Sequence, residues 1–447
     1  MTAGKPVDQD PYEVIGIGFG PANLALAVAL AETQTPTGTG TGAETAQGAP
    51  APARTLPGRT LFFERKPRFG WHQDMLIEGA TMQVAFLKDL ATMRNPTSTF
   101  TYISYLHSRH RLADFINSKS FYPYRVEYHD YLEWAAQRLD HLVRYDSEVV
   151  AVRARYEDGI ADLLEVDVRT QGRTRTHLTR NVVIGAGLVP KLPKDAAVSG
   201  RIWHSAELLS RLKDVPADRG TSFAVVGAGQ SAAEVVAHLH QTYQGADVHA
   251  VFSRFGYSVA DDSPLANRIF DPVAVDQFYQ APENVREMLL DYHRDTNYSV
   301  VDLDLTQELH DITYREGLSG RRRLHLHNVS RLRGVTESPD GVDLVVEFLP
   351  SGEVETIRVD ALVYATGYEP ADPLALLGDL GAQCKRDDQG RLVLGRDYQV
   401  ITSDSLQCGL YLHGAGAEHT HGLTAGLLST VATRAGEITR SILDHVR

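Results

Sequence analysis

The chain has 447 residues, enough for two or three domains with hydrophobic cores of their own. Hydrophobic residues make up 43% and charged residues 23%, and the net charge of −13 argues against nucleic acid or an anionic membrane as the main partner. The two cysteines, Cys384 and Cys408, have no CxxC neighbour, and neither an export signal nor a run of 18 apolar residues is visible. We therefore expect a cytoplasmic protein with no metal site.

The first predicted nucleotide-binding unit begins the chain. The apolar run Tyr12–Ile17 predicts a buried strand, and residues 21–32, with Ala and Leu at core spacing, predict a helix. A glycine turn lies between them, formed by Gly16, Gly18, Gly20 and Pro21. The first two glycines allow a close approach of the backbone to a pyrophosphate at the helix N-terminus, where proline is well tolerated.

The second strand of this unit is expected at Thr60–Phe63, and Glu64 at its end could accept the ribose hydroxyls of a nucleotide. Glu64 lies farther from the turn than the usual ~20 residues. The excess is the Thr-, Gly-, Ala- and Pro-rich segment 33–59, which lacks apolar periodicity and predicts a mobile surface loop.

A second unit follows the same pattern far along the chain. Residues 221–226 and 247–252 predict its strands, and the first strand leads into a second glycine turn. The turn consists of Gly227, Gly229, Gln230 and Ser231, with Ala232 at the third pattern position. Alanine there is common for NADP. Arg254, which follows the second strand, could pair with a 2′-phosphate or could be a solvated surface residue.

The remaining elements surround this second unit. A helix is expected at 128–139, strands at 142–153, 164–169, 181–184 and 360–364, helical structure at 283–293 and a long helix at 424–446. The strand at 360–364 and the last helix are expected to return to the first domain. This layout predicts an α/β protein with two Rossmann-like domains, the second inserted in the first, and two dinucleotides held at once, usually a flavin and the nicotinamide that reduces it.

Several longer motifs carry a more specific signal. They are MQVAFLKDLATMRNP at 82–96, YPYR at 122–125, HDYL at 129–132, DDSPLAN at 261–267, NYSVVD at 297–302, ATGY at 365–368 and EHTHGL at 418–423. With these motifs the chain resembles the flavin-dependent N-hydroxylating monooxygenases, specifically the L-ornithine N5-hydroxylases of siderophore and peptide biosynthesis. The resemblance covers all but the first ten residues and the low-complexity segment.

The resemblance implies an activity and a domain plan. FAD would lie in a domain made of residues 1–195 and 355–447, NADPH would lie in residues 200–350, and residues 262–304 would contribute to a small mixed substrate region. The implied reaction is FAD- and NADPH-dependent hydroxylation of the side-chain amine of L-ornithine with O2, by a C4a-hydroperoxyflavin. Family members are often tetramers, so a homotetramer or homodimer is expected.

The resemblance also implies roles for single residues. Lys88 would bind the substrate carboxylate, Asn267 and Asn297 would hold its α-amino and carboxylate groups, and Ser429 would lie near the side-chain amine. The implied FAD residues are Gly16, Gly18, Gly20, Pro21, Glu64, Trp71, His72, Gln83, Thr420 and Leu428. The implied NADPH residues are Gly227, Gly229, Gln230, Ser231, Arg254, Tyr298, Ala365, Thr366 and Gly367.

Other functions stay open at this point. Within the class, an L-lysine N6-hydroxylase differs by one methylene of substrate, and an aliphatic diamine hydroxylase would leave Lys88 without a carboxylate. A disulfide reductase would need a CxxC pair, and a non-catalytic NADPH-binding flavoprotein is a further alternative. The spacing of His413, His419 and His421 is a weak signal for zinc, since no cysteine or clustered carboxylate accompanies it.

Overall fold

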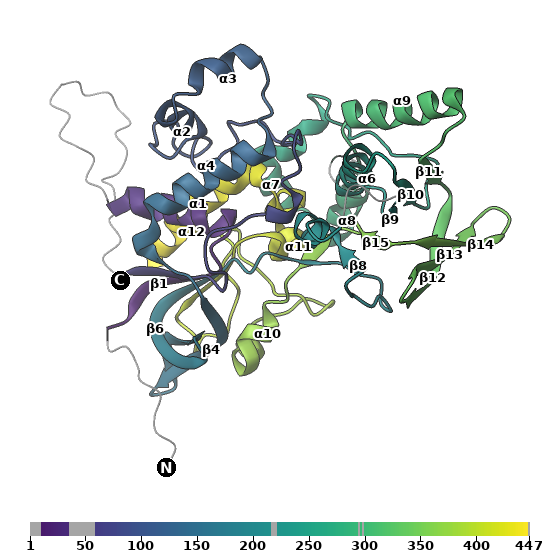
Figure 1. Ribbon diagram of the computed structural model, residues 1–447. Coiled ribbons are helices and arrows are strands. Elements are labelled where there is room, and N and C mark those ends of the chain that lie inside the picture. Colours follow the sequence, from purple (N-terminus) through teal and green to yellow (C-terminus); the bar gives the residue numbers. More distant parts are fainter. Residues whose placement is uncertain (1–9, 35–58, 216–220, 294–295, 297–298, 446–447) are drawn as a thin grey trace.

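The computed structural model describes residues 10–34, 59–215, 221–293, 296 and 299–445. The predicted loop at 33–59 falls almost entirely outside these residues, as do Asn297 and Tyr298. Two β-sheets stand side by side, the first with parallel and antiparallel strands and the second with parallel strands only (Figure 1). A short pair of strands joins them. Among the described residues no helix is long and apolar enough to cross a membrane.

The first sheet contains both predicted strands of the first unit. Its order is β3-β2-β1-β6-β5-β4, with β17 paired to β6. Strands β3, β2, β1, β6 and β17 run parallel, whereas β5 and β4 continue β6 as an antiparallel meander. The bounds are β1 Tyr12–Ile17, β2 Thr60–Phe63, β3 Val143–Arg144, β4 Ser147–Glu157, β5 Ile160–Thr170, β6 Arg173–Ile184 and β17 Gly409–Leu412.

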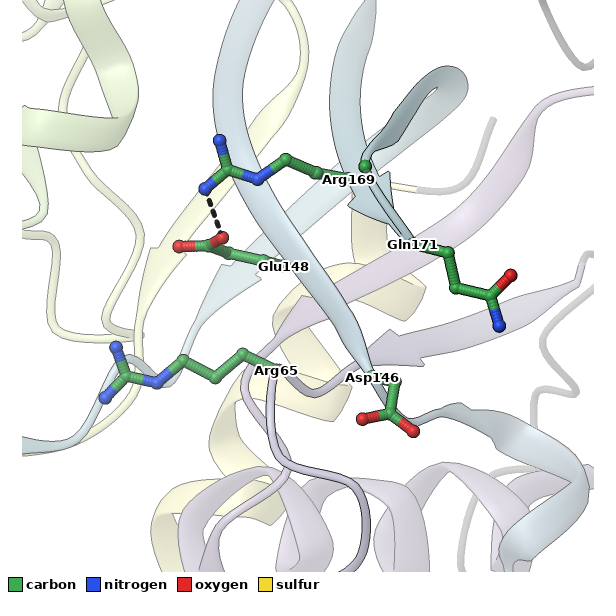
Figure 2. Close-up of a pocket in the computed structure, with 6 residues that line it drawn as sticks. Arg65, Asp146, Glu148, Arg169 and Gln171 are labelled. Atoms are coloured by element: carbon green, nitrogen blue, oxygen red, sulfur yellow. Dashed lines mark hydrogen bonds and ion pairs between the residues drawn. The ribbon is translucent and has the colours of Figure 1, made fainter.

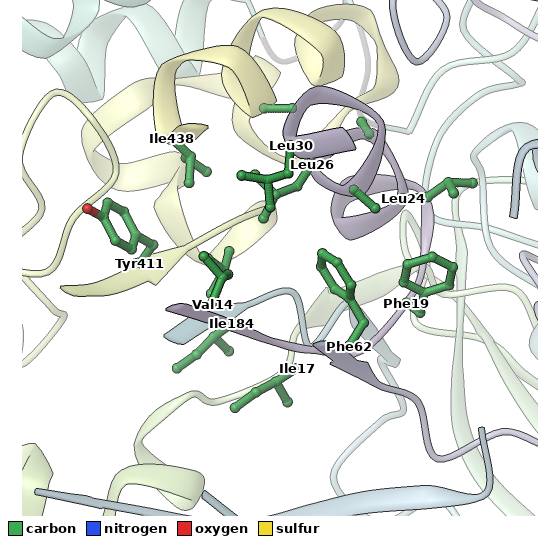
Figure 3. Close-up of a cluster of buried hydrophobic side chains, with 14 of the residues drawn as sticks. Val14, Ile17, Phe19, Leu24, Leu26, Leu30, Phe62, Ile184, Tyr411 and Ile438 are labelled. Atoms are coloured by element: carbon green, nitrogen blue, oxygen red, sulfur yellow. The ribbon is translucent and has the colours of Figure 1, made fainter. Parts of the chain in front are cut away.

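Three helices cover this sheet: α1 (Pro21–Gln34), α4 (Arg125–Arg138) and α12 (Val431–His445). Helix α1 contacts both others, and residues 23–30 are buried without exception. A helix that is apolar all round is stable only when covered on every side. Figure 3 shows the resulting core, in which Leu26 and Leu30 of α1 lie near the sheet residue Val14, with Ile438 of α12 beside them.

The second sheet has five parallel strands in the order β11-β10-β9-β15-β8. Helix α6 (Gln230–Thr242) packs against it, and a three-stranded antiparallel sheet shares a separate core with it. The bounds are β8 Ile202–His204, β9 Ser222–Val226, β10 Asp247–Val251, β11 Leu324–His327, β12 Ser330–Ser338, β13 Gly341–Phe348, β14 Val354–Val359 and β15 Ala361–Tyr364. The connection between the sheets is the antiparallel pair β7 (Leu188–Pro190) and β16 (Tyr368–Pro370).

The other helices lie around the two sheets. They are α2 Tyr102–Ser108, α3 Leu112–Ser118, α5 Leu208–Leu212, α7 Pro272–Gln280, α8 Glu283–Tyr292, α9 Leu303–Ser319, α10 Leu374–Leu377 and α11 Glu418–His421. Short 3-10 turns include η1 Gln73–Met75, η3 Ser205–Glu207, η4 Ala266–Phe270, η8 Leu423–Gly426 and η9 Leu428–Thr430.

Three expectations were wrong in detail. The strand at 360–364 does not return to the first domain: β15 pairs with β9 and β8, because its four buried residues complete the second sheet. The domain boundary at 355 is wrong for the same reason. The last helix begins at Val431 rather than 424, since η8 and η9 occupy the preceding residues.

Candidate active site

The first glycine turn has the shape that a dinucleotide needs. Gly18 has a φ of +79°, and a Cβ built on it would lie 2.6 Å from the carbonyl oxygen of Gly185, so a larger residue is excluded. A Cβ on Gly20 would meet nothing within 4 Å. The N-terminus of α1 therefore faces open space at the carboxyl ends of β1 and β6, which fits a pyrophosphate.

Glu64 lies beside this turn, at the end of β2. Its Oε2 accepts a hydrogen bond from the Phe19 N–H (2.7 Å), and its Oε1 accepts one from the Lys66 N–H (2.9 Å). The carboxylate is buried. Glu64 thus tightens the turn in this state, and a ribose contact would have to share its oxygens.

The second glycine turn is enclosed in the same way, by the residue that follows the neighbouring strand of its own sheet. Gly227 has a φ of +148°, and a Cβ on it would lie 2.3 Å from the carbonyl oxygen of Ala365. Gly229 caps the N-terminus of α6, and Gln230 begins the helix, followed by Ser231. The predicted Ala365-Thr366-Gly367 segment therefore lies directly against this turn.

The same segment leads into the connecting strands. The Thr366 hydroxyl donates to the Lys191 carbonyl, and Tyr368 pairs with Pro190. The Tyr368 ring contacts His72 (5.4 Å between ring centroids), which has a left-handed backbone. Burial, reinforced by Arg125 and Lys66, lowers the pKa of His72 to about 4, so this ring is neutral at physiological pH.

Trp71 packs beside His72, against the hydrophobic core of the first sheet. The side chain of Gln83 is exposed. Gln83 reaches across to the second unit, where its Nε2 donates to Asp302 Oδ1 (3.2 Å). Asp302 is the last residue of the NYSVVD motif, and the resemblance implies no role for it.

Arg254 lies in the second unit at the predicted 2′-phosphate position. It is half-buried, and its Nη1 donates to the Ser299 carbonyl (2.9 Å). Together with residues 255–258 it lines a hollow of ≈ 480 Å³. Phe255 in this hollow is 87% exposed, so an apolar face lies beside the guanidinium.

Lys88 lies beside the turn that carries Asn267, although the two residues come from different units. The Lys88 Nζ is 5.3 Å from the ring centre of Phe270, and Asn267 and Phe270 both belong to η4. Burial lowers the pKa of the Lys88 ammonium, against the attraction of Asp271. The Asn267 Nδ2 donates to the Asp262 carbonyl (2.8 Å), which fixes its side chain.

Turn η4 also contacts η8, which precedes the segment that carries Leu428 and Ser429. Ser429 is buried, and Leu428 packs against the first core cluster. Arg434 on α12 holds this segment by donating to the carbonyls of Thr424 (3.0 Å) and Leu427 (3.4 Å). Sequence reasoning missed Arg434 and Phe270. No local signal marked Arg434, because α12 also contains Glu437, Arg440 and Asp444.

Of His413, His419 and His421, the latter two bond backbone carbonyls. His419 Nε2 bonds the Leu392 carbonyl (2.8 Å), and His421 Nε2 bonds the Arg396 carbonyl (3.1 Å). His413 is buried at the end of β17, where neither ring nitrogen has a hydrogen-bond partner in the structure. Thr420, a predicted FAD residue, is buried and shares its hydroxyl with the ring of His421 (2.8 Å).

A larger hollow, of ≈ 740 Å³, lies on the surface of the first sheet (Figure 2). Its lining includes Arg65 and Asp146, and an ion pair joins Arg169 to Glu148. It borders the Glu64 end of the first unit but contains none of the predicted site residues.

Two dinucleotide turns facing one junction define a two-dinucleotide oxidoreductase fold. The model of the L-lysine 6-monooxygenase/L-ornithine 5-monooxygenase family matches residues 10–370, and the chain belongs to that family.

The similar proteins include two curated L-ornithine N(5)-monooxygenases. The one from Pseudomonas aeruginosa is 34% identical, over 98% of this chain and 94% of the relative. The one from Burkholderia cepacia is 39% identical, over 92% and 90%. Among solved structures, the ornithine N-hydroxylase of Kutzneria sp. 744, solved with reduced FAD, NADP+ and L-ornithine, has a TM-score of 0.88 and 44% identity, over 97% of this chain and 99% of that one.

Proposed function

We propose that the protein hydroxylates the side-chain amine of L-ornithine, with FAD and NADPH as cofactors and O2 as the oxidant. The amine becomes a hydroxylamine, NADPH is oxidised to NADP+, and the second oxygen atom leaves as water. The observation that carries the proposal is the position of Lys88 beside Phe270 of η4, the turn that also carries Asn267. The family and the ornithine hydroxylases it contains support the reaction.

We assign the two turns to the two cofactors. FAD would lie on Gly16, Gly18, Gly20 and Pro21, with Glu64 at its ribose and Trp71, His72, Gln83, Thr420 and Leu428 near its ring. NADPH would lie on Gly227, Gly229, Gln230 and Ser231, with Arg254 at its 2′-phosphate and Tyr298, Ala365, Thr366 and Gly367 along it. The first domain would then comprise residues 1–195 and those after β16, and the second domain the residues between.

The substrate would be held at both ends. A half-buried ammonium at Lys88 pairs best with a carboxylate, and the fixed amide of Asn267 presents an oxygen to the α-amino group. Asn297 would assist there, and Ser429 would lie near the side-chain amine. Bound FAD supplies the oxygen-transfer chemistry, so the protein's task is to position the amine.

The protein must also present a neutral amine. A free alkylamine has a pKa of about 10.4, as in lysine, and its ammonium form has no lone pair to react. A buried site around Ser429 and Leu428 lowers that pKa by desolvation. The same burial excludes water, which limits loss of the oxidant as H2O2.

L-Lysine is the strongest alternative substrate, because the family model covers lysine 6-monooxygenases as well. Fixed anchors at both ends select chain length, so the longer lysine side chain should overshoot and at most stimulate NADPH oxidation. Diamines lack the carboxylate that Lys88 would bind. A homotetramer or homodimer in the cytoplasm remains our proposal for its state in the cell.

The test measures hydroxylamine formation and NADPH oxidation side by side with ornithine, lysine, putrescine and cadaverine. We expect coupled hydroxylation of ornithine alone. Lysine hydroxylation at a kcat/KM equal to or above that of ornithine would promote the lysine alternative. Bound FAD without substrate-stimulated NADPH oxidation would instead favour a non-catalytic flavoprotein.

A further inference from the structure

A chain of hydrogen-bonded side chains crosses the junction between the two units. The first link joins Gln83 to Asp302, because Gln83 Nε2 donates to Asp302 Oδ1. The second link joins Asp302 to Gln230, whose Nε2 donates to Asp302 Oδ2 (3.0 Å). Gln230 Nε2 also donates to Glu234 Oε1 (3.0 Å), and Glu234 holds Arg125. The chain thus begins and ends on the first unit but passes through the second glycine turn.

The ion pair at its end is the strongest contact. Arg125 Nη2 and Nη1 donate to Glu234 Oε1 (2.6 Å) and Oε2 (2.8 Å), and the two side chains are only 12% and 6% exposed. Arg125 begins α4 of the first unit, whereas Glu234 lies on α6 of the second. A two-pronged pair shielded from solvent fixes orientation as well as distance.

Arg125 also holds the piece of chain that lies between the units. Its N–H donates to the Ala80 carbonyl (2.8 Å), and its Nη1 donates to the Met75 carbonyl (3.0 Å). Met75 and Ile77 pack in the core of the second unit, although in the sequence they lie between β2 and β3 of the first sheet. One guanidinium therefore ties α4, this segment and α6 together.

Asp302 fixes the other end of the junction. Its N–H donates to Gln230 Oε1 (2.9 Å) while its Oδ2 accepts from Gln230 Nε2, so both ends of that amide are engaged. Gln230 directly follows Gly229. The second glycine turn is consequently held at a set position relative to Gln83.

We propose that Arg125, Glu234 and Asp302 are positioning residues for hydride transfer, which set the second unit against the first so that the nicotinamide of NADPH meets the flavin. In this step a hydride passes from NADPH to FAD, so NADPH is oxidised and FAD reduced. The inference rests on the proposed function. Transfer of this kind depends steeply on geometry, and a misplacement of about 1 Å can cost roughly 100-fold in rate.

The test uses two conservative variants of the FAD-loaded protein. Glu234→Gln removes the charge and keeps the shape, and Arg125→Lys keeps the charge and removes the two-pronged contact. We expect anaerobic flavin reduction at saturating NADPH, followed by stopped-flow absorbance, to slow at least tenfold in both. The affinity for 2′,5′-ADP, which contains only the phosphate end of NADPH, should stay within twofold.

The matched control is Asp343→Asn, which breaks the exposed ion pair with Arg358 on the three-stranded sheet of the same unit. Its reduction rate should equal that of the wild type. Reduction rates within twofold of the wild type in both junction variants would overturn the proposal. A loss of 2′,5′-ADP affinity as large as the loss of reduction rate would also overturn the proposal, because the second glycine turn itself would then have collapsed.

Two further arms keep the result interpretable. If a junction variant does not fold, Asp302→Asn takes its place, with an expected three- to tenfold slowing, and an unchanged rate contradicts the proposal. Reduction by dithionite bypasses the hydride step, so the variants supplied with NADP+, ornithine and O2 should then give the wild-type yield of hydroxylated ornithine. Failure of the wild type in that arm would contradict the proposed function but not the positioning role.

Discussion

The two glycine turns resemble each other in sequence, yet their surroundings differ. The first is enclosed by its own sheet: Gly18 lies against Gly185, and Glu64 at the end of β2 holds Phe19. In the second turn, Gly227 likewise lies against Ala365 of its own sheet. The helix that follows this turn, α6, is however joined to the first unit by the Arg125–Glu234 ion pair. Binding at the first turn therefore depends on one domain, whereas binding at the second depends on how two domains meet.

This difference suits two cofactors with different residence. A flavin that stays bound through many turnovers can be treated as part of a core, and α1 behind the first turn is buried throughout residues 23–30. NADPH must enter and leave in each cycle, so a site at a junction can respond to domain position. Substitutions at each turn can therefore affect FAD binding and NADPH binding separately.

Substituting Gly18 should have the largest effect. Gly18→Ala places a Cβ 2.6 Å from a backbone oxygen at a φ of +79°, so we expect a stability loss of at least ~2 kcal/mol and little bound FAD. Gly227→Ala should instead keep FAD and lose NADPH binding. The FAD-to-protein ratio and the affinity for NADPH distinguish them, with Gly200→Ala, which has open space around it, as control. Equal FAD loss in both variants would refute the distinction.

Lys88→Ala should abolish ornithine hydroxylation while NADPH still reduces the flavin. Loss of a half-buried carboxylate partner costs about 2–5 kcal/mol of binding. The measurement is ornithine affinity by titration, beside the rate of anaerobic flavin reduction. Lys385→Ala, at an exposed lysine, is the control. Unchanged ornithine affinity in the Lys88 variant would remove this residue from the site.

Acid should destabilise the region around α11 through His421. Burial lowers the pKa of this ring to about 3, below the ~6.5 of an unfolded histidine, so the unfolded chain binds more protons between these values. Its contribution to stability is complete above pH 6.5 and declines as the pH falls towards 3. Between pH 7.5 and 5, His421→Gln should lose about 2 kcal/mol less free energy of unfolding than the wild type.

Urea unfolding at the two pH values measures this difference. The control is His310→Gln, since the side chain of His310 is 74% exposed. A wild-type pH dependence that His421→Gln leaves unaltered would show that other groups cause it.

Arg254→Ala should weaken the preference for NADPH over NADH about tenfold, or ~1.4 kcal/mol, because a partly exposed cation contributes modestly to phosphate binding. FAD content should not change. The ratio of kcat/KM values for the two cofactors is the measurement, with Arg268→Ala as an exposed control. A ratio equal to the wild type would mean that Arg254 does not contact the 2′-phosphate.

Local patterns predicted the two nucleotide units well, and the reason is physical. The strands Tyr12–Ile17 and Thr60–Phe63 were predicted with their observed bounds, because buried parallel strands are short apolar runs ended by glycine or charge. The strand at 361–364 was also found, but its sheet was not. Which strands pair depends on contacts between residues far apart in the sequence, and the residues of one strand do not indicate its neighbours.

The site was only partly predictable for the same reason. Lys88 and Gly227 stand in motifs, whereas Glu234 is a single charge in the apolar stretch Ala232–Leu239 and has a purpose only once Arg125 is beside it. Phe270 likewise becomes relevant only through Lys88. Contacts across a domain junction join residues more than a hundred positions apart, and no local period reports them.

The smallest effect is expected from shortening the connection between α1 and β2, which is much longer than its counterpart in the second unit. Residues 243–246 join α6 to β10 in the second unit, whereas residues 35–59 join α1 to β2 in the first. Residues 38–53 have no pattern that could bury a face, and closure entropy changes by only about 0.6 kcal/mol per doubling of loop length. Deleting 38–53 should therefore leave FAD content, melting temperature and ornithine hydroxylation nearly unchanged. A deletion of the same length within β4 and β5, which pair across the sheet, is the contrasting control and should prevent folding. A marked fall in melting temperature or FAD content on deleting 38–53 would mean that this connection supports the first turn, and that the first turn too depends on contacts outside its own sheet.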